Sequence, residues 1–150
     1  MSSASLMTLN ELIEEFEFLG DWEARCDFLI DLGFELPKLP EDQKIEKNRV
    51  HGCQSNVWLV ASMVDASQPG SEGSERVVEL LANSDAMIVN GLIAVLMAIY
   101  NHKTPKAILA TDVEEIFKKL ELDRHLSPAR KNGLFGMVKK VRQIVVEEAA

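Results

Sequence analysis

Cysteine is scarce in this chain of 150 residues, which contains only Cys26 and Cys53. The two are far apart in the sequence, so there is no Cys-x-x-Cys pair for a dithiol oxidoreductase and no set of closely spaced thiolates for a zinc site. The chain also begins without a basic and apolar leader. These features predict a protein of the reducing cytoplasm, with neither a disulfide framework nor a metal site.

Long apolar runs are missing as well. The longest covers Ala86 to Tyr100 and is interrupted by Asn90 and Gly91, which is too short to span a bilayer. Positive charge is in deficit, with 16 Lys and Arg against 24 Asp and Glu, for a net charge of -8. This balance argues against non-specific binding to nucleic acid or to anionic membranes, and predicts a protein partner with a basic patch.

The length predicts one domain with a core of its own. No internal repeat, low-complexity tract or linker divides the chain. We therefore expect a disordered N-terminus over residues 1–7 and a single domain over residues 8–148.

The first part of that domain has a helical pattern. Thr8 and Glu11 have the spacing of a capping box, and the apolar residues that follow recur at helical spacing until Gly20. Asp21 is placed to cap a second helix that ends near Gly33. Two N-terminal helices are predicted.

Strand signals follow. The segments Asn48–His51, Ser55–Val64 and Glu75–Leu81 have strand character, and Asp65–Ser74 is a loop rich in Gly and Ser. Together they predict a meander of three antiparallel strands.

The remainder is helical. Ala86–Tyr100 is apolar nearly all round, so we expect a helix buried on several sides that begins at Ser84 or Asp85. Start signals for further helices occur at Thr104-Pro105, at Asp112 with Glu115, and at Ser127-Pro128. Because helices and strands are segregated, the predicted class is α+β: two N-terminal helices, a small three-stranded antiparallel sheet, and three to four C-terminal helices that cover the sheet.

Cys53 is the best candidate for chemistry. Gly52 permits a tight bend before the long strand, so the thiol would sit on a turn at the mouth of that strand. Arg49 or a protonated His51 would raise the fraction of thiolate, which is the nucleophilic form. The alternative is that Cys53 is a small buried hydrophobic residue, as free cysteines often are. Trp58 would either cover this turn or belong to the core.

Other catalytic arrangements find little support. A cysteine hydrolase needs a histidine base, but His51, His102 and His125 have no diagnostic spacing from Cys53. Cys26 lies on the apolar stripe of the second predicted helix, which makes it a core residue.

A basic cluster, Lys139, Lys140 and Arg142, lies on the last predicted helix. It would either contact an acidic partner or form a solvated face balanced by Glu147 and Glu148.

The motifs around Cys53 resemble those of the SufE-type sulfur-acceptor proteins of iron–sulfur cluster assembly, including the related CsdE branch. The resemblance extends from Asn10 to Val145. It is carried by these segments: Asp21-Trp22-Glu23, Leu32-Gly33, Leu36-Pro37, Gly52-Cys53-Gln54-Ser55, Val57-Trp58, Ser84-Asp85-Ala86, Ile88-Val89, Gly91-Leu92-Ile93-Ala94, Thr104-Pro105 and His125-Leu126-Ser127-Pro128-Ala129-Arg130.

The resemblance implies a SufE/IscU-like fold and a function in sulfur transfer. Such a protein is a carrier rather than an enzyme: it activates a pyridoxal-phosphate cysteine desulfurase of the SufS or CsdA type, takes persulfide sulfur onto Cys53, and passes it to an iron–sulfur scaffold complex. It has no cofactor of its own, and we expect a monomer or a weak homodimer.

The resemblance also implies roles for residues near Cys53. Asp85 would help to hold the cysteine loop, although it could equally be the N-cap of the central helix. Arg130 would lie near the partner surface, although it is also an ordinary basic residue of a first helical turn. The remaining loop-supporting residues are His51, Gly52, Gln54 and Ser55.

Two alternatives to the carrier stay open. One is a binding module that regulates the desulfurase without carrying sulfur. The other is an IscU-like scaffold that assembles the cluster itself, which would need about three cysteine ligands.

Overall fold

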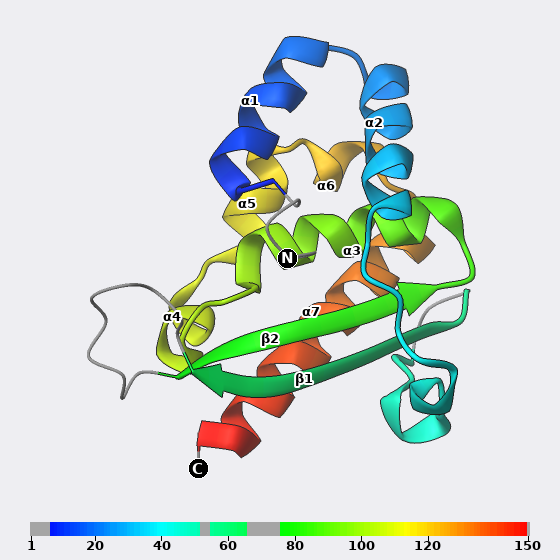
Figure 1. Ribbon diagram of the computed structural model, residues 1–150. Helices are drawn as coiled ribbons and strands as arrows, with labels where there is room; N and C mark the ends of the chain where they lie inside the picture. Colours follow the sequence, from blue (N-terminus) through cyan, green and yellow to red (C-terminus); the bar gives the residue numbers. More distant parts are fainter. Residues whose placement is uncertain (1–6, 52–54, 66–75, 150) are drawn as a thin grey trace.

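The computed structural model describes residues 7–51, 55–65 and 76–149 (Figure 1). These residues form seven α-helices and one antiparallel sheet, so the predicted α+β class is confirmed. The α-helices and strands are α1 (Leu9–Leu19), α2 (Trp22–Phe34), β1 (Val57–Asp65), β2 (Arg76–Ser84), α3 (Met87–Tyr100), α4 (Pro105–Ala110), α5 (Val113–Lys119), α6 (Leu122–His125) and α7 (Pro128–Ala149). The predicted disorder of residues 1–7 falls, apart from Met7, outside the described residues.

Local sequence signals explain the two N-terminal helices. The Thr8 hydroxyl accepts a hydrogen bond from the Glu11 N–H at 3.2 Å, and the Glu11 carboxylate accepts one from the Thr8 N–H at 2.9 Å, which completes the predicted capping box. Gly20, at φ 80°, makes the turn between the helices. The Asp21 carboxylate then caps α2 by accepting from the Ala24 N–H at 2.8 Å.

Helix α3 is the centre of the fold. Most of its residues are buried, and α1 and α2 pack on it (Figure 1). Two glycines allow a close approach between α2 and α3: a Cβ at Gly91 would overlap the Leu29 carbonyl oxygen, and a Cβ at Gly33 would lie 2.8 Å from the Gly91 nitrogen. The backbones of these helices are therefore in contact.

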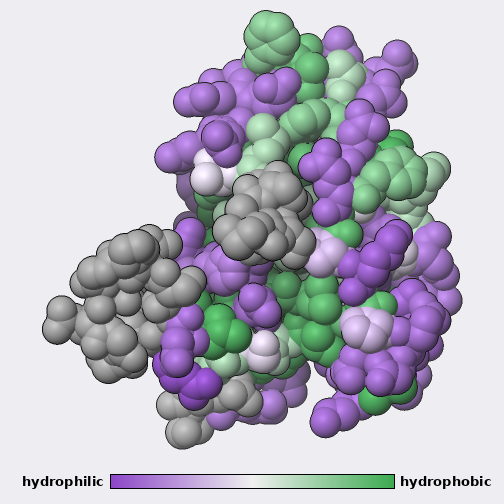
Figure 2. All heavy atoms as spheres, in the orientation of Figure 1, coloured by the Kyte–Doolittle hydropathy of each residue, from purple (hydrophilic) through white to green (hydrophobic). Residues whose placement is uncertain are grey.

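The sheet is antiparallel, and its register pairs Val57 with Ser84 and Asp65 with Arg76. Five side chains on its inner face are buried: Val57, Leu59, Val78, Leu80 and Ala82. On this face β2 packs on α3, and β1 packs on α7, which passes behind the strands in Figure 1. The outer face carries half-buried Trp58, Val60 and Leu81. Figure 2 shows apolar surface gathered over the middle of the strands on this face.

The predicted three-stranded sheet is wrong for the described residues, where the sheet has two strands. The segment expected as the first strand, Asn48–His51, instead begins in a 3-10 helix, η3 (Glu46–Asn48), which follows another, η2 (Glu41–Gln43). Short-range hydrogen bonds close that turn, and only one bridge, Arg49 with Trp58, joins the segment to β1. The expected loop falls largely in residues 66–75, outside the described part of the chain.

The C-terminal helices begin at the predicted signals. Thr104 caps α4 with Pro105 in the first turn, Asp112 caps α5, and the Ser127 hydroxyl accepts a hydrogen bond from the first turn of α7. The short α6 was not predicted; it follows Glu121, which has left-handed backbone angles (φ 60°, ψ 22°) and separates it from α5. Within the described stretches, none of the helices combines the length and apolar character that crossing a membrane requires.

Candidate functional site

The predicted site centres on Cys53, which lies outside the described residues together with Gly52 and Gln54. The structure does describe both flanks of this segment, His51 before it and Ser55 after it. The site is therefore built from these flanks and from the elements against which they pack.

The flank before Cys53 approaches α7 closely. A Cβ on Gly136 would lie 3.1 Å from the His51 carbonyl oxygen and 3.6 Å from Val50, which is buried. The imidazole of His51 is exposed, and its Nε2 lies 3.0 Å from Glu46. The Arg49 guanidinium also lies near Glu46, at 3.6 Å. The two side chains expected to favour a thiolate, Arg49 and His51, thus contact one carboxylate.

The flank after Cys53 is tied to the segment between β2 and α3. The Asn56 backbone N–H donates to Asp85 Oδ1 at 3.2 Å, and the Asn56 side-chain amide donates to Asp85 Oδ2 at 2.9 Å. In return, the Asp85 N–H donates to the Asn56 carbonyl oxygen at 3.3 Å. Asp85 thus fixes the chain three positions after Cys53.

The alternative role of Asp85, as N-cap of the central helix, is wrong. The N-cap position of α3 is Ala86, without a side-chain capping bond. The turn is held instead by Asn90, whose side chain accepts from the Ser84 N–H at 2.7 Å and donates to the Ser84 carbonyl at 3.0 Å. The Asp85 carboxylate is therefore available for Asn56.

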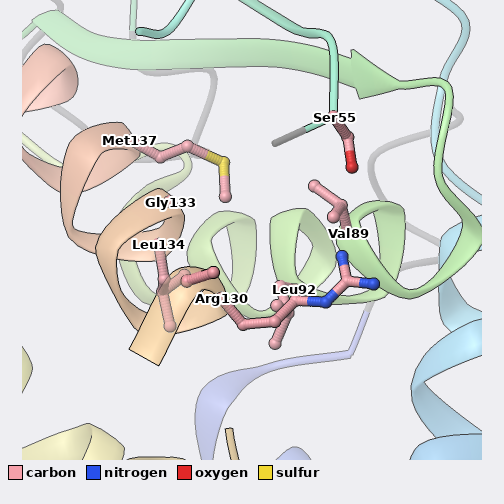
Figure 3. A pocket seen from close by; sticks show the side chains of 8 residues that line it. Ser55, Val89, Leu92, Arg130, Gly133, Leu134 and Met137 are labelled. Atoms are coloured by element: carbon pink, nitrogen blue, oxygen red, sulfur yellow. The ribbon is translucent and has the colours of Figure 1, made fainter. Parts of the chain in front are cut away.

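A small pocket lies beside Ser55, between α3 and α7 (Figure 3). Its volume is about 20 Å³, enough for one water-sized group. The lining is mainly apolar: Val89 and Leu92 come from α3, and Ala129, Gly133, Leu134 and Met137 come from α7. Figure 3 shows the side chains of Ser55, Val89 and Met137 pointing toward the same space.

Arg130 is the charged residue in the lining of this pocket. It belongs to the first turn of α7, where its backbone N–H donates to the Ser127 hydroxyl at 3.2 Å. Its half-buried side chain extends toward Val89 in Figure 3. The structure thus places two predicted site residues, Ser55 and Arg130, in one pocket, and links a third, Asp85, to it through Asn56.

The other two histidines make contacts of their own. His125 stacks on Trp22, with ring centroids 4.8 Å apart and an interplanar angle of 5°. His102 lies at the end of α3 and 3.5 Å from Glu79.

Cys26 is half-buried on α2. Burial, and to a smaller extent the charge of Asp27, raise the pKa of its thiol. At neutral pH it is therefore a poor nucleophile. Among the described residues, no three His, Cys, Asp or Glu side chains come together in a way that could hold a metal ion.

Sequence reasoning missed Asn56 and Gly136. The signal for Asn56 was a short polar residue immediately before a strand, a type that commonly makes local hydrogen bonds. Gly136 was visible as a glycine within a predicted helix, which often marks a close packing contact.

This fold and this pocket define a class: a small α+β domain in which both flanks of a cysteine-bearing segment are anchored, the second of them beside an apolar pocket. The chain belongs to the SufE family, because the family described as an Fe-S metabolism associated domain matches residues 10–145.

Similar proteins support this assignment. The chain is 39% identical to an uncharacterised SufE-like protein of Rhizobium etli, over 97% of this chain and 94% of the relative. It is 38% identical to a second uncharacterised SufE-like protein, from Rhizobium meliloti, over 91% and 94% of the two chains. The solution structure of a hypothetical protein from Thermus thermophilus has the same fold, with a TM-score of 0.69, 23% identity, and coverage of 94% of this chain and 97% of that one.

Proposed function

We propose that this protein is a cytoplasmic sulfur acceptor that activates a pyridoxal-phosphate cysteine desulfurase and relays sulfur from it, on Cys53, to an iron–sulfur scaffold complex. The observation that carries the proposal is the family match over residues 10–145, which includes the Gly-Cys-Gln-Ser segment at Cys53. The family is associated with Fe-S metabolism, and Cys53 is the chain's cysteine outside the helix that holds Cys26.

The transfer is a thiol exchange. The Cys53 thiolate attacks the terminal sulfur of the partner's cysteine persulfide, and a new S–S bond forms as the partner's S–S bond breaks. The partner's cysteine leaves as a thiolate, and Cys53 then carries the persulfide. Sulfur changes hands without any external oxidant or reductant.

The geometry around the segment supports this role. Asp85 anchors the chain just after Cys53 through Asn56, and the close approach at Gly136 positions the chain just before it. The adjacent pocket is lined mainly by apolar side chains and holds one water-sized group. In our proposal, these anchors keep the Cys53 segment beside the pocket until the desulfurase docks.

Arg130 is proposed to contact the desulfurase, because its guanidinium lies at the pocket next to the Cys53 segment. An Arg130→Ala variant should bind the desulfurase about tenfold more weakly, the effect typical of one important interface arginine. Arg124→Ala, which removes an exposed arginine paired with Glu121, is the matched control and should change the affinity little. Titration calorimetry with the purified desulfurase measures both.

The decisive experiment is mass spectrometry of the whole protein after incubation with a cysteine desulfurase and cysteine. We expect a gain of one sulfur atom on Cys53, none in Cys53→Ser, and an undiminished gain in Cys26→Ser. If Cys53 gains no sulfur while the protein still binds and stimulates the desulfurase, the protein is a regulatory binding module. Iron–sulfur absorption bands on the protein itself, after reconstitution with iron, would instead indicate a scaffold.

A further inference from the structure

One edge of the sheet has free backbone groups. Ala61 pairs with Leu80, whose N–H points away from β1 and donates to the Asn101 side chain at 2.9 Å. Residues directly opposite each other in an antiparallel ladder point their backbone groups either toward each other or both away. The N–H and C=O of Ala61 therefore point outward, at the edge of β1 that faces away from β2.

The same argument applies at the next outward position. Met63 pairs with Val78, whose N–H and C=O bond to Lys103 and His102 rather than to β1. The Met63 N–H is therefore at the free edge, while its carbonyl accepts a hydrogen bond from the Arg76 guanidinium at 3.0 Å. Within the described residues, no backbone partner pairs with this edge at Ala61 or Met63.

The described residues start a third strand on this edge but do not continue it. The Val50 N–H donates to the Val57 carbonyl at 2.9 Å, and Arg49 bridges Trp58. Beyond Trp58 the described chain leaves the edge open. A further extended segment would continue the sheet where the protein's own backbone stops.

A groove of about 470 Å³ runs beside this edge, between β1, η3 and the C-terminal half of α7. Its lining includes Ala61 of β1, Lys47 of η3, and Lys140, Ile144 and Glu147 of α7. The basic cluster of α7 is thus divided between two sides of the helix. Arg142 turns to the Leu109 carbonyl at 3.3 Å, whereas Lys140 lines the groove.

The groove is locally basic in an acidic protein. Neither Lys47 nor Lys140 forms an ion pair with a carboxylate of the described residues, and the Lys140 ammonium lies 3.4 Å from the Lys47 carbonyl oxygen. Glu147 is seven positions further along α7, about 10 Å from Lys140 along the helix axis. Unpaired cations next to unpaired backbone groups favour an occupant that brings both a strand and negative charge.

We propose that the free edge of β1 binds an extended acidic segment of a partner protein, which adds to the sheet as a third strand. Strand addition of this kind uses main-chain hydrogen bonds for affinity and alternate side chains for specificity. A second copy of this chain fits less well, because antiparallel pairing of two β1 edges would bring the lysines of two identical grooves together.

The geometry also specifies the pattern of the segment. Side chains of an added strand alternate between the two faces of the sheet. Those on the α7 side meet Lys47 and Lys140, and those on the outer side continue the apolar surface of Val60 and Leu81. The preferred segment therefore alternates acidic and apolar residues.

The test is fluorescence polarisation with the full chain and a labelled heptapeptide of alternating glutamate and valine. We expect saturable binding with a dissociation constant below about 1 mM, weakened about tenfold by the double variant Lys47→Glu, Lys140→Glu. A peptide of alternating lysine and valine is the matched control. It should bind at least about tenfold more weakly than the glutamate peptide, a loss similar to that expected from the double variant. Absence of saturable binding, or equal binding of both peptides, would overturn the proposal and leave the lysines as protection against edge-to-edge aggregation.

A second pair of variants tests the backbone contact. Ala61→Pro removes the outward N–H at a position where an edge strand tolerates proline, whereas Ala61→Thr keeps it. We expect Ala61→Pro to abolish binding and Ala61→Thr to retain measurable binding, because threonine keeps the N–H although it enlarges a residue of the groove lining. If Ala61→Pro lowers the melting temperature too far to be used, the peptide carries an N-methyl group on its central residue instead, and retained binding of that peptide counts against strand addition. None of these readouts depends on sulfur transfer at Cys53.

Discussion

Both oxygens of the Asp85 carboxylate accept hydrogen bonds from one residue, Asn56, through its backbone N–H at 3.2 Å and its side-chain amide at 2.9 Å. The pair joins the start of β1 to the loop before α3. It lies next to the chain segment that carries Cys53, so its strength bears on how that segment is held.

Asp85→Ala is expected to release the chain after Cys53. It removes both acceptors, and because the pair is exposed, the cost in unfolding free energy is about 1 kcal/mol or less. The rate of Cys53 alkylation by iodoacetamide should rise several-fold, since in our proposal this pair keeps the Cys53 segment beside the pocket. Peptide mass spectrometry at neutral pH follows the reaction.

Asp85→Asn is the control for that experiment, because an asparagine keeps one acceptor oxygen and the size of the side chain. It should give an intermediate rate. Cys26 serves as an internal standard, since burial raises the pKa of its thiol and slows its reaction in every variant. Equal Cys53 rates in Asp85→Ala and the parent protein would show that the pair does not restrain the segment.

The helices could be predicted because their start signals are local. The capping box of Thr8 and Glu11, the caps at Asp21 and Asp112, and the proline at Pro105 all act within a few residues. Neither the lack of a third strand among the described residues nor the unexpected α6 had such a signal. The first depends on how the chain leaves the β1 edge, and the second on a left-handed backbone at a glutamate, which sequence patterns rarely reveal.

Some residues around the candidate site could be anticipated from the sequence, whereas their roles stay predictions. The family motifs pointed to Asp85, Ser55 and Arg130, and the structure brings Ser55 and Arg130 to one pocket. The partner of Asp85 could not be inferred, because Asn56 lies 29 positions away in the sequence. Contacts of this kind exist only once the fold is formed.

Gly91→Ala is expected to destabilise the protein strongly. Its Cβ would overlap the Leu29 carbonyl oxygen, and a backbone atom held within a helix cannot move aside as a flexible side chain can. The unfolding free energy should fall by about 3 kcal/mol, the upper part of the range for overpacking. Urea denaturation followed by circular dichroism measures it.

Gly20→Ala is the control for Gly91→Ala, because it introduces backbone strain without steric overlap. Gly20 has φ 80° and ψ -48°, and a Cβ there would meet no atom within 4 Å, so only the backbone strain of about 2 kcal/mol remains. If Gly91→Ala costs no more than Gly20→Ala, the contact between α2 and α3 is looser than the structure indicates.

Glu121 links the stability of the fold to pH. Arg25 is buried on α2, donates from Nε to the Phe16 carbonyl at 2.8 Å, and donates from Nη1 to Glu121 at 2.6 Å. The hydrogen bond from Arg25 is the main reason that the pKa of the Glu121 carboxyl lies below its ordinary value. A carboxyl whose pKa is lower in the folded state than in the unfolded state stabilises the fold above the unfolded pKa, about 4.3, and loses this contribution as the pH falls through the folded pKa.

Glu121→Gln should therefore reduce stability most at neutral pH. The difference from the parent protein should shrink as the pH falls from the unfolded pKa, about 4.3, through the lower folded pKa, where the parent's carboxyl also becomes neutral. Glutamine keeps the size of the side chain, so the strain of the left-handed backbone is nearly the same in both proteins. Urea midpoints between pH 7 and pH 3 measure the effect. Glu114→Gln, at an exposed position of α5 and outside the described ion pairs, is the matched control and should follow the parent's pH profile. The hydrogen bond from Arg25 to a charged carboxylate must weaken when the carboxylate is protonated. If the urea midpoints of Glu121→Gln and the parent protein differ by the same amount at every pH, the charge of Glu121 therefore does not contribute to stability.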